Sequence, residues 1–210
     1  MGLFAASALM LTTARAALLA PGNAIPLSLE PGPVGATLLA STNVSFTGIN
    51  FFGNTNFTGN LSSSVYAGDI SNPLGGLTFT YLLHNDATSS DTLGRLTLGR
   101  YAGYLTDVGF NGPGIVPFNA VRSANGDQID FNLLSGPPTF QHNLLPGADT
   151  VLLVIQTDSL VFNIGNASVI DNAVANAVAF VPTAVVPEPT TLSLAAIGLV
   201  AALLRRQVRR

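Results

Sequence analysis

The chain of 210 residues contains no cysteine, no lysine and no tryptophan, and only 9% of its residues are charged. Without cysteine it can form neither a disulfide framework nor a thiolate metal site. Without lysine it is excluded from chemistry that needs a lysine amine, such as Schiff-base catalysis. Soluble domains average about 25% charged residues, so this chain depends on the uncharged polar groups of Asn, Thr, Ser and Gly to stay hydrated.

The few charges are unevenly distributed. Between Ala17 and Pro187, nine aspartates and Glu30 stand against three arginines, which gives this part of the chain a net charge of −7. An acidic segment without a basic patch repels phosphate backbones, and we therefore exclude nucleic acid as a partner. The remaining basic residues lie near the two ends of the chain, four of them in the last six positions.

Residues 1–16 have the layout of a signal peptide. A short apolar core runs over residues 3–11, and Ala14 and Ala16 form the small-x-small pattern that a signal peptidase accepts. We predict export from the cytoplasm with cleavage after Ala16. The first residues carry no basic side chain. The alternatives are therefore a misassigned start codon, which omits a basic n-region from the sequence, and an ordinary buried helix.

The C-terminal end has three parts. Pro187, Glu188 and Pro189 interrupt regular structure, and a mostly apolar, uncharged run follows from Leu192 to Leu204. As a helix, residues 189–204 would span about 24 Å, short of the roughly 30 Å of a hydrocarbon core. We predict a short transmembrane helix whose arginines stay cytoplasmic while the body lies outside. These membrane-stop residues are Arg205, Arg206, Arg209 and Arg210.

This triplet, apolar run and arginine cluster resemble the PEP-CTERM sorting signal, here over residues 187–210. The resemblance implies that Pro187, Glu188 and Pro189 are recognised and processed by a membrane-embedded exosortase. It also implies an exported protein of a Gram-negative bacterium that makes exopolysaccharide, with an inner-membrane intermediate before the cell surface or extracellular matrix. The alternative is a plain C-terminal membrane anchor that no enzyme cleaves.

The body, residues 34–181, has the pattern of β-strands. Apolar residues alternate with other residues in three stretches, and one further stretch is continuously apolar, as in a strand covered on both faces. Turn-forming pairs with Gly, Pro or Asn separate the stretches. We predict an all-β single domain, an antiparallel β-sandwich or jelly roll, with one weak helical pattern over 171–178. The alternating sets are Leu77, Phe79, Tyr81 and Leu83, then Ile129, Phe131 and Leu133, then Leu160, Phe162 and Ile164; the continuous run covers 151–155.

Two flanking segments and one short repeat complete the organisation. Four prolines between positions 21 and 33 predict an extended N-terminal segment over 17–33, and residues 182–186 are expected to link the body to the tail. Within the body, Phe-Thr-Gly at 46–48 recurs at 57–59. We interpret the two copies as neighbouring strands of one hairpin.

The sequence offers little equipment for catalysis. It contains no G-x-S-x-G nucleophile elbow, no phosphate-binding loop of the G-x-x-x-x-G-K kind and no H-E-x-x-H zinc motif. His84 and His142 could in principle serve a Ser-His-Asp site, because triads assemble in space. Without a nucleophile motif we interpret both as locally hydrogen-bonded loop residues. We predict a protein that is not an enzyme and has no cofactor.

Candidate ligand sites are equally sparse. Two groups of oxygen ligands could hold calcium on loops, but turn-forming Asp and Asn residues need no metal, and we predict none. Three tyrosines could stack on sugars, although tyrosine also packs well at sheet edges. The leading hypothesis is a non-catalytic structural or adhesive surface protein; the alternative is a secreted hydrolase or glycan-binding module with a site assembled from scattered residues. The candidate calcium ligands are Asn125, Asp127 and Asp130 in one group and Asn85, Asp86 and Asp91 in the other; the tyrosines are Tyr66, Tyr101 and Tyr104.

Overall fold

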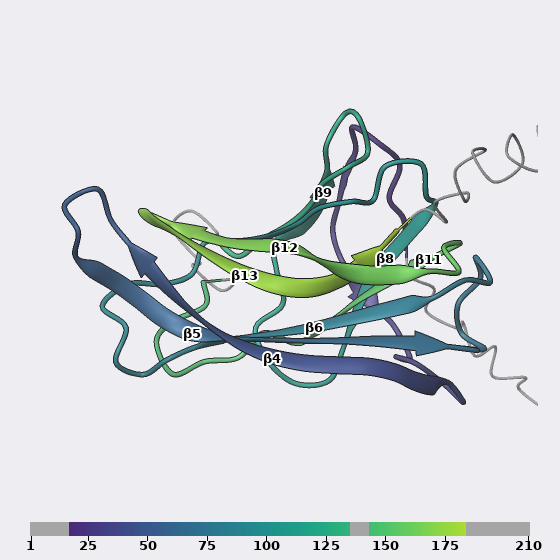
Figure 1. Ribbon diagram of the computed structural model, residues 1–210, viewed down its shortest axis with the longest axis horizontal. Coiled ribbons are helices and arrows are strands. Elements are labelled where there is room, and N and C mark those ends of the chain that lie inside the picture. The colour runs from purple at the N-terminus through teal and green to yellow at the C-terminus, as the bar shows by residue number, and fades with distance from the viewer. Residues whose placement is uncertain (1–16, 135–142, 184–210) are drawn as a thin grey trace, which may run out of the picture.

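The computed structural model describes residues 17–134 and 143–183, and every regular element within these ranges is a β-strand (Figure 1). The all-β prediction is therefore confirmed. All strand pairs are antiparallel except that of β3 with β8. The thirteen strands of these ranges are β1 (Ala17–Leu18), β2 (Ala24–Ile25), β3 (Ser28–Leu29), β4 (Thr37–Ile49), β5 (Thr55–Ala67), β6 (Thr78–Asn85), β7 (Arg95–Leu98), β8 (Thr106–Asn111), β9 (Asn119–Arg122), β10 (Ile129–Asn132), β11 (Leu152–Thr157), β12 (Phe162–Asp171) and β13 (Ala173–Pro182).

These strands form one continuous hydrogen-bonded sheet rather than the two separate sheets of a sandwich or jelly roll. Their order is β1-β8-β11-β6-β5-β4-β13-β12-β7-β10-β9-β2, with β3 also beside β8. Figure 1 shows β4, β5 and β6 in one layer, with β12 and β13 in another. The prediction of two sheets is thus corrected. Strands as long as β4 and β5 accumulate enough right-handed twist for the sheet to fold over its own core.

The N-terminal segment joins the two ends of this sheet order. β1 pairs with β8 at one end, and β2 pairs with β9 at the other. β3 then pairs with the next two residues of β8. The prolines of the segment lie between and after these short strands, not inside them, which fits their inability to donate a ladder hydrogen bond.

The core follows the predicted alternation on two strands. Phe79, Tyr81 and Leu83 of β6 are fully buried, as are Ile129 and Phe131 of β10. β11 is buried on both faces from its second residue onward, as the continuous apolar run predicts. These strands therefore supply the central packing of the sheet.

The Phe-Thr-Gly repeat is confirmed as one hairpin, formed by β4 and β5. In its antiparallel register Phe46 lies opposite Gly59, and Gly48 lies opposite Phe57. A β carbon on Gly48 would collide with the ring of Phe57, and one on Gly59 would collide with the ring of Phe46. The two rings meet edge to face with centroids 6.2 Å apart. Each phenylalanine thus needs the glycine of the other copy.

The predicted core face of β12 is correct for Phe162, which packs against the core, but wrong for Leu160 and Ile164. Leu160 precedes the strand and is 78% exposed, and Ile164 is 55% exposed. Gly165 and Ala167 face the core instead. A β carbon on Gly165 would collide with the side chain of Val181, so the close approach of β13 decides which face of β12 is buried.

The weak helical pattern over 171–178 is also overturned, because β13 begins at Ala173. Alternate alanines of β13 are buried, which is a period of two. The strand pairs with β12 along its whole length, through a turn at Asn172 with φ 31°. Ten consecutive cross-strand pairs outweigh the helix propensity of the alanines.

Candidate functional site

The residues predicted for cleavage and sorting lie outside the described ranges: Ala14, Ala16, Pro187, Glu188, Pro189, Arg205, Arg206, Arg209 and Arg210. Residues close to them are part of the fold. Ala17 pairs with Val108, and the backbone N–H of Thr183 donates to the carbonyl of Val161 at 3.0 Å. Over residues 17–134 and 143–183 the structure contains no helix long and apolar enough to cross a membrane.

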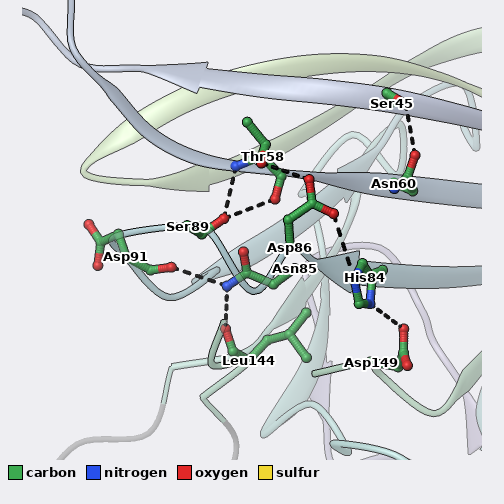
Figure 2. A network of polar contacts seen from close by, with 10 residues as sticks. All are labelled: Ser45, Thr58, Asn60, His84, Asn85, Asp86, Ser89, Asp91, Leu144 and Asp149. Atoms are coloured by element: carbon green, nitrogen blue, oxygen red, sulfur yellow. Dashed lines mark hydrogen bonds and ion pairs between the residues drawn. The ribbon is translucent and has the colours of Figure 1, made fainter. Parts of the chain in front are cut away.

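Of the described residues, His84 and its neighbours most resemble a catalytic site (Figure 2). The ring lies near the end of β6, half-exposed, where an isolated bridge joins His84 to Asp149. Its Nδ1 lies 2.8 Å from Oδ1 of Asp149, and its Nε2 lies 3.6 Å from Oδ1 of Asp86. We call these three side chains the His84 cluster.

The geometry of the His84 cluster does not fit a catalytic triad. A triad needs a carboxylate at one ring nitrogen and a nucleophile at the other. Here both nitrogens face carboxylates, and the second one, Asp86, also accepts a hydrogen bond from the Thr58 hydroxyl at 2.7 Å. The arrangement ties β6 to β5 and to the isolated bridge residue Asp149. His142 lies outside the described residues.

The neighbouring candidate calcium ligands, Asn85, Asp86 and Asp91, hold adjacent loops in place through hydrogen bonds. Asn85 is fully buried, and its amide donates to the carbonyls of Asp91 and Leu144 at 3.1 and 3.0 Å. Asp91 in turn accepts from the backbone N–H of Thr92 and from the amide of Asn172. Figure 2 shows the amide of Asn85 turned toward these carbonyls and away from Asp86. The group therefore does not converge on one point as metal ligands do.

The other candidate calcium group, Asn125, Asp127 and Asp130, is divided between a turn and a strand. The Asn125 side chain accepts from the backbone N–H of Asp127 at 3.1 Å and from the hydroxyl of Ser123 at 2.7 Å. Asp130 lies on β10, where it accepts from Thr97 at 2.6 Å and faces Arg95 at 3.8 Å. Across the described part of the chain, no group of three or more acidic or histidine side chains, the His84 cluster included, has an arrangement that could hold a metal ion.

The tyrosines do not form a sugar-binding face. Tyr101 is completely buried, and its hydroxyl lies 2.7 Å from that of Tyr81, which donates to the carbonyl of Phe180 at 2.6 Å. Burial raises the pKa of both phenols, so they remain neutral hydrogen-bonding groups. Tyr66 and Tyr104 are half-buried. Tyr101 is therefore corrected from a candidate ligand residue to a core residue.

Sequence reasoning missed the most heavily bonded charge, Arg122 of β9, which is only 3% exposed. Its guanidinium makes five hydrogen bonds of 2.7–3.0 Å, all to neutral oxygens. Burial lowers its pKa, although the charge of Asp158 opposes that effect. Arg122 joins β9 to β8 and to the N-terminal segment. The acceptors are the carbonyls of Leu19, Tyr101, Tyr104 and Gly126 and the hydroxyl of Thr106.

Sequence reasoning also missed Asp69, a buried residue that accepts several hydrogen bonds and is 7% exposed. It accepts hydrogen bonds from the backbone of Val34, from the backbone and hydroxyl of Ser71, and from the hydroxyl of Thr78. Burial alone would raise the pKa of Asp69, but these hydrogen bonds together lower it below its ordinary value. An Asp followed two residues later by Ser is a local turn signal, but no sequence pattern announces the contact with Val34.

Comparison with known proteins bears on the tail. The model of the PEP-CTERM protein-sorting motif matches residues 185–210, which confirms the resemblance based on Pro187, Glu188, Pro189 and the arginine cluster. The motif implies export and exosortase-dependent sorting in bacteria. No curated protein and no solved structure gives a significant match to the chain.

Proposed function

We propose, starting from the PEP-CTERM motif, that this chain is an exported, non-catalytic protein of the bacterial surface or extracellular matrix. An exosortase recognises Pro187, Glu188 and Pro189 and processes the chain from an inner-membrane intermediate. The match over residues 185–210 is the observation that carries the proposal. Association with exopolysaccharide in a Gram-negative bacterium rests on the resemblance to this family alone.

The composition of the tail supports a temporary membrane stage. Two prolines around Glu188 keep the triplet extended and accessible. The apolar run from Leu192 to Leu204 is short for a permanent anchor. The four arginines behind it resist transfer through the bilayer and hold the run in place until the triplet is processed.

The start of the fold supports export with cleavage after Ala16. Ala17 is already paired with Val108, so cleavage at this position removes the leader and leaves every described strand intact. Because the pairing would hinder a protease, cleavage must precede the closure of β1 onto β8. Export of an unfolded chain provides that order.

Two observations support a non-catalytic body. Both nitrogens of His84 face carboxylates, which leaves no position for a nucleophile. The surface hairpin of β4 and β5 presents Ser, Thr and Asn side chains bonded to one another, as in the pairs of Ser41 with Ser64 and Ser45 with Asn60. Such neutral polar groups suit contact with hydrated matrix rather than chemistry.

The decisive experiment replaces Glu188 with Ala in a host that has its own exosortase. We expect export and signal cleavage to proceed normally while tail processing stops, so that full-tail protein accumulates in the inner membrane. Thr190→Ala, in the same segment, is the matched control and should be processed. Immunoblots of membrane, surface and medium fractions give the readout.

A second variant separates processing from membrane retention. Replacing all four C-terminal arginines with Gln should let molecules pass the membrane without stopping, so that unprocessed protein appears outside. If Glu188→Ala is processed and localised like wild type, the tail is a passive anchor and the proposal fails.

A further inference from the structure

Strand β4 is paired along the length of one edge and at one position along the other. Its inner edge pairs with β5 from Thr37 to Ile49. Along its outer edge only one residue pair is in register with β13, Ile49 opposite Val174, although β13 also packs close to β4. Within residues 17–134 and 143–183, no other strand pairs with the outer edge of β4. Alternate residues along such an edge present backbone N–H and C=O groups that a further strand can pair with.

The sequence lacks the usual protection of an edge strand. Natural sheets guard their edges with charged side chains, prolines or bulges. From Thr37 to Gly68 there is neither a charged residue nor a proline. The irregularities of β4 lie at its ends, between Leu38 and Ala40 and between Gly48 and Ile49. The regular stretch between them is therefore open to strand addition.

Exposed apolar side chains lie at the two ends of this hairpin. At its tip, which projects beyond the rest of the fold at the left of Figure 1, Phe51 and Phe52 are 97% and 83% exposed. Their ring centroids lie 5.7 Å apart. Asn50 fixes the tip, because its Oδ1 accepts from the backbone N–H groups of Phe52 and Asn54. We call Phe51 and Phe52 the tip patch.

The other end of the hairpin carries a matching set. Leu38 and Leu39 are about half-exposed, and Ile70 is 81% exposed. We call these three residues the base patch. Ile70 is held at this end because its N–H donates to the carbonyl of Val34. The outward residues of β4 between the patches are Ser41, Asn43, Ser45 and Thr47, so the hairpin is apolar at both ends and polar in the middle.

This arrangement of apolar patches and polar residues along the edge of β4 is self-complementary. A two-fold axis that brings the same edge of two copies together makes the two strands antiparallel. With the axis at Asn43, Leu39 of one copy lies opposite Thr47 of the other, and each tip patch reaches the base patch of its partner. The existing pair of Ile49 with Val174 lies outside this stretch and is undisturbed.

We propose that the outer edge of β4 is a pairing site for β4 of a second copy of this chain, which extends the sheet across a two-fold dimer. The edge carries no charge, so the acidic bodies meet where repulsion is weakest. Burying Phe51 and Phe52 removes about 150–250 Å² of accessible surface from water for each ring. The two rings thus supply about half of the roughly 800 Å² per partner that stable interfaces bury. Because the contact is isologous, it closes at the dimer.

The absence of cysteine permits a direct test. Asn43→Cys introduces the sole thiol of the full-length chain, and in an antiparallel pair opposite Cα atoms lie about 4.5–5.5 Å apart, within disulfide range. We expect mild oxidation of the protein in detergent to give a covalent dimer at least tenfold faster than Asn166→Cys. Asn166 is the matched control, exposed on β12 but away from the edge.

A charge exchange tests the axis without crosslinking. Asn43→Lys and Asn43→Asp should each raise the dimer dissociation constant at least tenfold in analytical ultracentrifugation, because like charges then face each other. An equimolar mixture of the two variants should restore the dimer. The pairing is refuted if Asn43→Cys crosslinks no faster than its control, if it crosslinks to another host protein, or if both charged variants sediment like wild type. These readouts do not involve the tail, so they remain informative whatever the fate of Glu188→Ala.

Discussion

The Arg122 site and the His84 cluster are both built around a nitrogen-bearing side chain, but they differ in burial and in what they join. Arg122 is almost inaccessible and bonds five neutral oxygens on segments far apart in sequence. The ring of His84 is 36% exposed and faces two carboxylates. The cluster that looks catalytic therefore lies at the surface, where ion pairs contribute little. Arg122, which no sequence motif predicts, joins the strands and the N-terminal segment that close the sheet.

The largest expected effect is the loss of Arg122. Arg122→Ala removes five hydrogen bonds of a buried guanidinium, including one to each carbonyl of Leu19, Tyr101 and Tyr104. We expect the free energy of unfolding to fall by about 3–5 kcal/mol. Urea unfolding followed by circular dichroism measures it. Arg100→Ala, at an exposed arginine, should unfold close to wild type. A loss below about 1 kcal/mol would place the closure of the sheet elsewhere.

Asp69→Asn should have an intermediate effect that depends on pH. The pKa of Asp69 is lowered in the folded state, so its carboxylate stabilises the protein above the ordinary pKa of about 4 and this stability is lost as pH falls through the lowered value. We expect Asp69→Asn to cost about 1–3 kcal/mol at pH 7 and progressively less below pH 4. Urea unfolding at several pH values measures the slope.

Asp171 provides the control of opposite sign. Burial and the charge of Asp91 raise its pKa, against the hydrogen bond from Thr92. A raised pKa means that ionised Asp171 costs stability, so Asp171→Asn should unfold no more easily than wild type at pH 7. Equal pH slopes for Asp69→Asn and Asp171→Asn would contradict the assigned hydrogen-bond network.

The smallest effect is expected at His84. His84→Ala removes a half-exposed hydrogen bond to Asp149 and a contact with Asp86, and it should change the free energy of unfolding by at most about 1 kcal/mol. It should also leave a panel of polysaccharide and ester substrates as unreacted as the wild-type protein does. Hydrolysis by wild type that disappears in His84→Ala would reverse the contrast between the two sites and revive the hydrolase hypothesis.

What the sequence could predict depends on the range of the interaction. Period-two alternation identified the core faces of β6 and β10, because burial on a strand repeats every second residue. The Phe-Thr-Gly repeat identified a hairpin, because both copies are close in sequence. Alternation failed for β12, where the approach of Val181 to Gly165 decides the buried face. It could not find Arg122, whose acceptor Leu19 lies 103 residues away.

The sorting tail behaves in the opposite way. Its three parts follow one another within the last 26 residues, so a linear pattern is sufficient for the match. The sheet order is not linear, since β4 neighbours β13 and β1 neighbours β8. Neither pairing leaves a mark in either strand alone, and the single continuous sheet was therefore beyond sequence reasoning.

The joining of the sheet ends by residues 17–25 has a consequence for the order of folding. In the export that we propose, residues 17–25 leave the cytoplasm early, whereas their partners Val108 and Val121 follow about a hundred residues later. Contacts of such high contact order form slowly, because a long loop must close before they stabilise anything. In such an export the two ends of the sheet order cannot be joined until β9 has crossed the membrane. We expect that delay to keep the polypeptide unfolded, and so competent for translocation, for most of its passage.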